Sequence, residues 1–184
     1  MKKLIFALIA GATAMSAAQA QSPYVGLGVS ASDHTYKIGG GTNVDGDGWK
    51  GSAKIYGGVD INPMWAVETG FTKLTKADVN YNIGNARAGG EVDGRRAYVA
   101  AKASVPVNDQ VSVYGKLGAG YTKTKFNGTG LSLADSDTGV YAGLGAQYKI
   151  NDRTALTMEY ERYGKQKDFG AKADAVTLGA RYNF

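Results

Sequence analysis

Apolar and polar residues alternate along most of this chain, and the alternation constrains its fold more than any other feature. In the C-terminal segment 176–184, apolar side chains fall on even positions and polar or small ones on odd positions. A period of two predicts a β-strand with one apolar and one polar face. The same pattern recurs in seven earlier segments: 24–29, 53–60, 65–71, 98–105, 113–121, 140–148 and 156–161. We therefore predict eight strands.

The segments between the predicted strands alternate between short and long. The short ones are 62–63, 107–110 and 151–153, and the long ones, rich in glycine and charge, are about 33–49, 73–93, 123–137 and 164–173. This places every short turn at one end, as in outer-membrane barrels, and strands of about 9 to 11 residues fit a tilted membrane crossing. An open edge would leave backbone groups unpaired in hydrocarbon. We predict that residues 21–184 form an all-β, eight-stranded antiparallel up-and-down transmembrane β-barrel.

A soluble eight-stranded barrel with its apolar face inward would show the same alternation. Aromatic residues near both ends of the apolar faces favour the membrane barrel, because such side chains gather at the two membrane interfaces. Those near the short turns are Trp65, Tyr148, Tyr182 and Phe184, and those toward the long connections are Phe71 and Tyr121.

Residues 1–20 differ in composition from the rest of the chain. Lys2 and Lys3 precede an apolar run, 4–14, and small residues follow up to Ala20. This order is typical of a secretory signal peptide. The apolar run is about half of the roughly 20 residues that a membrane-spanning helix needs. We predict cleavage after Ala20, with Ala18 and Ala20 as the small residues of the cleavage site.

Composition argues against several classes of function. The formal net charge is +5, but the basic residues are scattered and form no patch typical of nucleic-acid binding. The chain has no cysteine and one histidine, His34, which follows Asp33 in the first long connection. A histidine beside an acidic residue is weak evidence for a lipid-modifying enzyme, and no metal-ligand spacing is visible. We therefore expect no enzymatic activity, no cofactor and no metal site.

Several short segments resemble a known family. They are Asn62-Pro63 leading into 66–71, the segment 101–107, Met158-Glu159-Tyr160 and the C-terminal Tyr182-Asn183-Phe184. In order and spacing they are similar to the OmpA-type transmembrane domain and its small relatives, the OmpX-like and opacity-type barrels, over essentially the whole mature chain. The resemblance implies a location in the outer membrane of a Gram-negative bacterium. It also implies that Tyr182 and Phe184 form the terminal aromatic signal read by the outer-membrane insertion machinery.

Charged residues on the polar faces are predicted to lie inside the barrel. The interior of an eight-stranded barrel is just wide enough to be filled by side chains. We expect inward glycines to leave room for large side chains such as Tyr56 and Tyr114. In the family that the chain resembles, an interior cluster of acidic and basic residues acts as a gate. The inward charges here are Lys54, Glu68, Lys102, Lys116, Glu159 and Arg181.

The resemblance carries over to some of these positions and not to others. Glu68 and Lys102 match members of the family's cluster, and Lys116 and Glu159 match further inward charged positions. Departures from the family pattern are Gly28 in place of lysine, Gln147 in place of an acidic residue and Thr157 in place of a basic one. We predict ion pairs centred on Glu68, Lys102, Lys116 and Glu159, and we favour a stabilising role for them over a gating role.

The function favoured by these features is that of an envelope structural component whose surface loops bind other molecules, like an adhesin. Loops held by a rigid scaffold often carry recognition. The expected partners are outer-membrane lipids and lipopolysaccharide, the insertion machinery, and a host or surface ligand of the loops. A narrow pore for ions or small solutes is the alternative, and a lipid-modifying enzyme is less favoured. Because a closed barrel needs no partner, we expect a monomer.

Overall fold

A computed structural model describes residues 22–32, 35–38, 42–45, 50–74, 77–83, 86–128, 131–164 and 173–184. The predicted signal peptide and His34 lie outside these residues. Within them the regular structure consists of strands, and no helix is long and apolar enough to cross a membrane. Eight strands form the barrel: β1 (Ser22–Ser32), β4 (Lys50–Asp60), β5 (Trp65–Lys73), β7 (Ala86–Pro106), β8 (Val111–Gly128), β9 (Leu131–Lys149), β10 (Thr154–Tyr163) and β11 (Ala173–Asn183).

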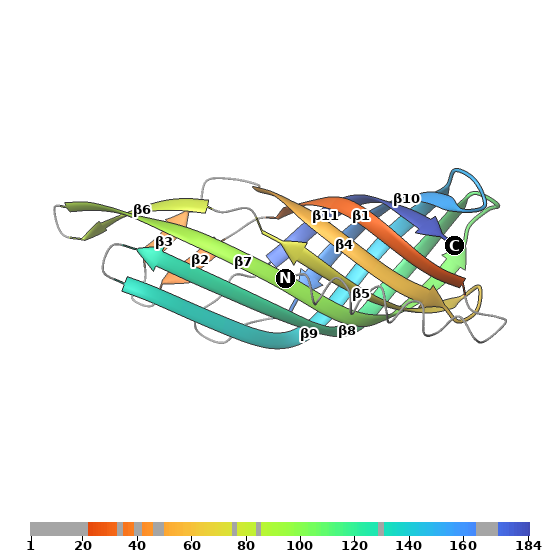
Figure 1. Cartoon of the computed structure of the whole chain (residues 1–184), viewed down its shortest axis with the longest axis horizontal. Coiled ribbons are helices and arrows are strands. Elements are labelled where there is room, and N and C mark those ends of the chain that lie inside the picture. The colour runs from red at the N-terminus through yellow and green to blue at the C-terminus, as the bar shows by residue number, and fades with distance from the viewer. Residues whose placement is uncertain are drawn as a thin grey trace.

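The sheet closes on itself through two pairings between strands (Figure 1). β1 pairs with β11, the last strand, with Leu27 opposite Ala180. β5 pairs with β7, with Phe71 opposite Ala97. All neighbouring barrel strands are antiparallel, so every barrel strand has a partner on both sides. The predicted eight-stranded up-and-down barrel is confirmed.

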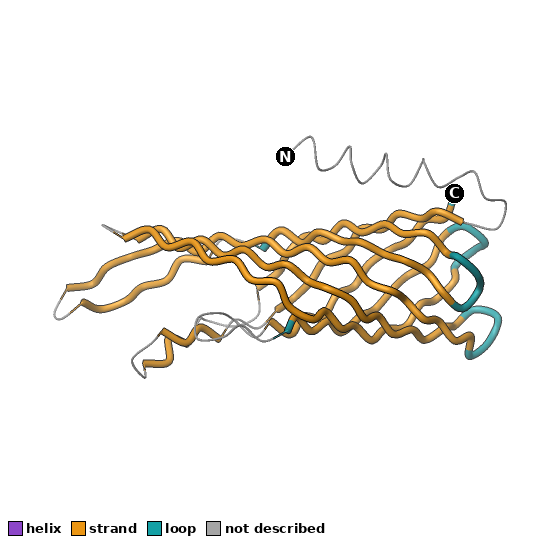
Figure 2. The backbone as a smooth tube through the Cα atoms, turned by 90° about the horizontal axis from the view of Figure 1, so that it is seen from below, coloured by secondary structure: helices purple, strands orange, loops and turns teal. Residues whose placement is uncertain are grey.

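Three short turns at one end of the barrel share one local structure (Figure 2). In each, an asparagine side chain accepts hydrogen bonds from the backbone N–H groups two and three residues later, at distances of 2.7 to 3.0 Å. These residues are Asn62, Asn108 and Asn151. The residue before each asparagine donates its N–H across the turn, as Ile61 does to the Trp65 carbonyl oxygen at 2.8 Å. An asparagine that caps its own turn fixes the register of the two strands it joins.

The strands at the opposite end are longer than predicted. β7, β8 and β9 contain 21, 18 and 19 residues, and the β7–β8 pairing runs without a break from Pro106 to Gly90. β6 (Ala77–Ile83) adds to the edge of β7, and β2 (Thr35–Ile38) with β3 (Thr42–Asp45) forms a separate hairpin. The prediction of loops over 73–93 and 123–137 is therefore wrong for most of these residues. Beyond the membrane both strand faces can be polar, so the ladder continues without apolar alternation.

The apolar face of the barrel points outward. Leu27 is 65% exposed and Leu144 is 68% exposed, whereas Glu68 on the opposite face is 1% exposed. A soluble barrel would show the reverse, with leucine inside and charge outside. The distribution therefore contradicts the soluble alternative and matches a barrel whose outer surface contacts lipid.

Candidate functional site in the barrel interior

Three of the inward charges predicted from the sequence meet at the centre of the barrel. Lys116 on β8 extends between Glu68 on β5 and Glu159 on β10. Its Nζ lies 2.6 Å from Glu68 Oε1 and 2.5 Å from Glu159 Oε2. None of the three side chains is more than 5% exposed. Because a buried charge is costly without a partner, each carboxylate stabilises the buried ammonium group and is stabilised by it.

A second ion pair lies beside the first, farther from the short turns. Lys54 Nζ is 2.6 Å from Glu161 Oε1 and 3.8 Å from Glu159 Oε1. Thr177 on β11 donates a hydrogen bond to Glu161 Oε2 at 2.6 Å. The alternation placed Lys54 inside but gave it no partner, and Glu161 was absent from the predicted cluster. We call Lys54, Glu68, Lys116, Glu159 and Glu161 the central charge cluster.

Two tyrosines complete the surroundings of Glu68. Tyr24 donates its hydroxyl proton to Glu68 Oε2 at 2.8 Å, and Tyr98 donates to Oε1, which also accepts from Lys116. The Tyr98 ring stacks on the Tyr141 ring with a centroid distance of 4.1 Å. Both carboxylate oxygens therefore have donors, and hydrogen bonds to an ionised group are among the stronger ones in proteins.

Two further tyrosines form hydrogen bonds with the carboxylates of Glu159 and Glu161. Tyr114 donates to Glu159 Oε2 at 3.1 Å. The Tyr141 hydroxyl lies 2.7 Å from Glu159 Oε1 and 2.8 Å from Glu161 Oε1. A tyrosine hydroxyl has one proton, so Tyr141 donates to one of these carboxylates at a time. The hydroxyl links the two ion pairs into one hydrogen-bonded network.

Glycines make room for the tyrosine rings, as the sequence predicted. A Cβ atom at Gly26 would lie 2.1 Å from the Tyr56 ring, and one at Gly145 would lie 2.5 Å from the Tyr114 ring. Real Cβ atoms do not approach so closely. Each of these glycines thus gives the ring of a neighbouring strand its space, and the interior is filled by side chains.

Lys102 is near the central charge cluster but outside its ion pairs. Its Nζ is 3.4 Å from Gln147 Oε1 and 4.1 Å from the centroid of the Tyr114 ring. Among the residues that the structure describes, no carboxylate lies within 4.0 Å of it. The expected ion pair at Lys102 is therefore not formed. Lys116 stands directly opposite Lys102 on β8 and takes the two carboxylates nearby.

Arg181 is buried closer to the short turns. Its guanidinium pairs with Asp60, donates from Nε to Asn183 Oδ1 at 2.7 Å and lies over the Tyr24 ring at 3.6 Å from the centroid. It belongs to a separate ion pair, and Tyr24 separates it from Glu68. The structure thus places Arg181 inside the barrel as predicted but not in the central charge cluster.

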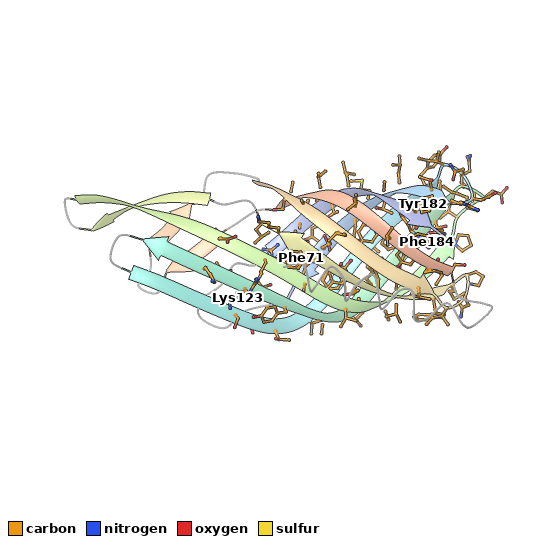
Figure 3. All side chains as sticks on the ribbon, in the orientation of Figure 1. Phe71, Lys123, Tyr182 and Phe184 are labelled. Atoms are coloured by element: carbon orange, nitrogen blue, oxygen red, sulfur yellow. The ribbon has the colours of Figure 1, made fainter. Side chains whose placement is uncertain are left out.

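The aromatic residues predicted for the two membrane interfaces point outward or are partly exposed. Tyr182 and Phe184 lie at the short-turn end, whereas Phe71 lies toward the other end (Figure 3). Tyr182 contacts Phe184 edge to face, with centroids 5.6 Å apart. Trp65 and Tyr148 at the short-turn end, and Tyr121 toward the loops, are exposed on the lipid-facing surface. The role of Tyr182 and Phe184 as an insertion signal stays a prediction.

Most charged groups in the centre of the barrel form ion pairs with one another. The central charge cluster holds three carboxylates and two ammonium groups, and Lys102 lies nearby without an ion pair among the described residues. Within the described residues, no three side chains of the types that bind metals lie together. The arrangement can hold the eight strands together through contacts that cross the barrel.

Comparison with known proteins gives the same fold and a family. The model of the outer membrane protein β-barrel domain matches residues 4–184. Outer membrane protein A of Shigella flexneri is 30% identical over 144 residues, which cover 72% of this chain and 40% of that protein. The protein of the same name from Escherichia fergusonii is 28% identical over the same shares. The chain spans about 40% of the length of these curated relatives.

Solved structures agree over nearly the whole chain. Ail, the attachment invasion locus protein of Yersinia pestis, is 25% identical with a TM-score of 0.61, covering 90% of this chain and 100% of that one. Neisserial surface protein A has a TM-score of 0.63 and covers the same fractions of the two chains. Its sequence identity is 15%, so this similarity concerns the fold alone. The bacterial outer membrane is the location that family and fold indicate. The chain belongs to the outer membrane protein β-barrel domain family.

Proposed function

We propose that this protein is a structural component of the outer membrane that binds other molecules through the end from which β7, β8 and β9 project, and that it has no catalytic role. The observation that carries the proposal is the continuation of these strands beyond the barrel, where β6 joins them as a fourth strand (Figure 1). A paired sheet presents side chains at fixed spacing, as a binding surface requires.

The filled interior supports the same proposal. Lys116 pairs across the lumen with Glu68 and Glu159 at 2.6 and 2.5 Å. The other oxygen of each carboxylate lies within hydrogen-bond distance of a tyrosine hydroxyl group, that of Tyr24 for Glu68 and that of Tyr141 for Glu159. A solute would have to displace these partners from one another. The similarity to Ail, a protein named for attachment and invasion, is consistent with a surface role.

The direct test shortens the projecting hairpin. In the variant, residues 124–135 are replaced by Asn-Gly, which forms a two-residue turn between Lys123 and Ser136, opposite each other in the native ladder. A second variant keeps the length of 124–135 but permutes its residues among positions of the same face. Folding is checked by the mobility shift of unheated protein in a detergent gel.

The measurement is the attachment of bacteria that produce each protein to cultured epithelial cells and to each other. We expect both folded variants to lose attachment, because the sequence on the projecting sheet supplies the contacts. Attachment equal to that of the native protein in the shortened variant would refute the proposal. If only the shortened variant lost attachment, the length of the projecting strands and not their sequence would account for the effect.

A narrow pore is the second candidate function, and Lys102 is the observation that favours it. Lys102 is 2% exposed, has no ion pair among the described residues, and lies opposite Ala66, two residues from Glu68. Planar-bilayer recording tests the pore. Silence or rare short openings would support the filled barrel, and a steady conducting level that changes in Glu68→Ala would make the pore the better assignment.

A further inference from the structure

Three basic residues stand side by side on the outer surface of the barrel. Lys73 on β5 is directly opposite Arg95 on β7, and Arg95 is directly opposite Lys123 on β8. Lys73 and Arg95 are exposed and Lys123 is half-buried. We call Lys73, Arg95 and Lys123 the basic row. Their strand neighbours Thr72 and Arg96 are buried on the inward face, so the basic row belongs to the lipid-facing surface.

The basic row follows the last apolar row of the barrel. Two residues nearer the short turns, the same three strands carry Phe71, Ala97 and Tyr121, again directly opposite one another. Figure 3 shows Phe71 and Lys123 on the part of the barrel away from Tyr182 and Phe184. Aromatic side chains mark the membrane interface. The basic row therefore lies at the level where the hydrocarbon ends and lipid headgroups begin.

No carboxylate within the described part of the chain forms an ion pair with the basic row. On the same face of β7, Asp93 stands opposite Lys125, one row farther out, and Glu91 stands opposite Asn127, two rows farther out. Adjacent strands are about 4.8 Å apart, and like charges directly opposite each other destabilise a sheet. Three neighbouring cations thus carry a mutual repulsion that an external anion would remove.

We propose that Lys73, Arg95 and Lys123 bind the phosphate groups of a lipid headgroup in the outer leaflet, the chemistry that lipopolysaccharide presents. Arginine matches phosphate with two parallel N–H donors, and lysine contributes a point charge. Long basic side chains lie along apolar surface while their charged ends reach the headgroups. The acyl chains of the same lipid would pack on the Phe71 and Tyr121 row.

The test compares two double variants that each remove one arginine and one lysine. Arg95→Gln with Lys123→Gln changes the basic row. Arg153→Gln with Lys149→Gln, two exposed residues at the short-turn end, is the matched control. A third variant, Arg95→Lys with Lys123→Arg, keeps the charges. All are folded in a non-ionic sugar detergent, which contains no phosphate.

The measurement is the affinity of each folded protein for bisphosphorylated lipid A and for lipid A with both phosphates removed. We expect the native protein, the charge-keeping variant and the control to prefer the phosphorylated lipid. The basic-row variant should bind it roughly 30-fold more weakly, the effect of two basic side chains beside an anionic lipid headgroup. Its affinity for the dephosphorylated lipid should be that of the native protein.

Three results would overturn the proposal. One is unchanged affinity of the basic-row variant for phosphorylated lipid A. Another is an equal loss for both lipids, which would assign the effect to packing. The third is a loss of affinity for a soluble sulfated polysaccharide with lipid binding intact, which would make the basic row a site for a soluble polyanion. Inorganic phosphate, added as a competitor, should displace the lipid only weakly, since it lacks the acyl chains.

Discussion

The charges inside the barrel and the charges at its rim lie on the same strands but are arranged in opposite ways. Inside, Lys116 has a carboxylate on each side, and the side chains of all three residues are at most 5% exposed. At the rim, Arg95 has a cation on each side and forms no ion pair with a carboxylate of the described residues. The interior excludes solvent, so the chain must supply each counter-charge itself. At the rim, water and lipid headgroups can supply it.

The largest expected effect comes from breaking an interior pair. Lys116→Met leaves Glu68 and Glu159 buried without their shared cation. We expect the free energy of unfolding in urea, measured on protein in lipid vesicles, to fall by about 3 to 5 kcal/mol. Lys102→Met is the matched control, because Lys102 is as buried but has no ion pair in the described structure. Its effect should be less than half as large, and equal losses would show that net interior charge matters more than pairing.

A lysine introduced on the lipid-facing surface should reduce stability less than the loss of the interior ion pair does. The reduction should depend on the depth of the lysine in the membrane. Leu117, on β8 midway between the short turns and the rim, is 65% exposed to the lipid side. Leu117→Lys should lower the free energy of unfolding in vesicles by about 2 to 4 kcal/mol. In Tyr121→Lys, next to the rim, burial of the new charge should lower it by about 1 kcal/mol at most. If the two positions cost the same, the membrane boundary does not lie at the Phe71 and Tyr121 row.

Two glycines on β8 should respond with opposite signs to the same substitution. A Cβ atom at the inward Gly118 would lie 2.0 Å from the Val99 carbonyl oxygen, whereas one at the outward Gly115 has its nearest neighbour at 3.9 Å. We expect Gly118→Ala to destabilise the barrel by about 1 to 3 kcal/mol. Gly115→Ala should stabilise it by about 0.5 to 1 kcal/mol through lower chain entropy. Urea titrations in one detergent compare the two directly.

The sequence predicted what depends on local pattern. Alternation assigned Glu68, Lys116 and Glu159 to the interior because facing direction has a period of two along each strand. It could not pair Lys54 with Glu161, since contacts across the lumen depend on the stagger of strands that are far apart in sequence. The same dependence on stagger explains why the ion pair predicted for Lys102 is wrong. Lys116 stands directly opposite Lys102 and pairs with both Glu68 and Glu159.

Of the other features, one has a signal in the sequence and two have no local signal. The apolar residue and asparagine before each short turn, at 61–62, 107–108 and 150–151, form a repeat that marks all three turns. The continuation of β8 through 122–128 has polar residues on both faces, so alternation stopped predicting strand where the ladder still runs. The basic row appears only when the register of β5, β7 and β8 is known.

The smallest expected effect has a sign that depends on the surrounding lipid. Arg95→Gln removes the middle cation of the basic row and so relieves the repulsion from Lys73 and Lys123. In non-ionic detergent the free energy of unfolding should rise by up to about 0.5 kcal/mol, within the range of surface substitutions. With phosphorylated lipid A in excess the same substitution should lower it, because a ligand stabilises the folded state that binds it. An effect of the same sign in both conditions would mean that the rim cations interact only with one another. The rim and the interior would then differ only in their exposure to water.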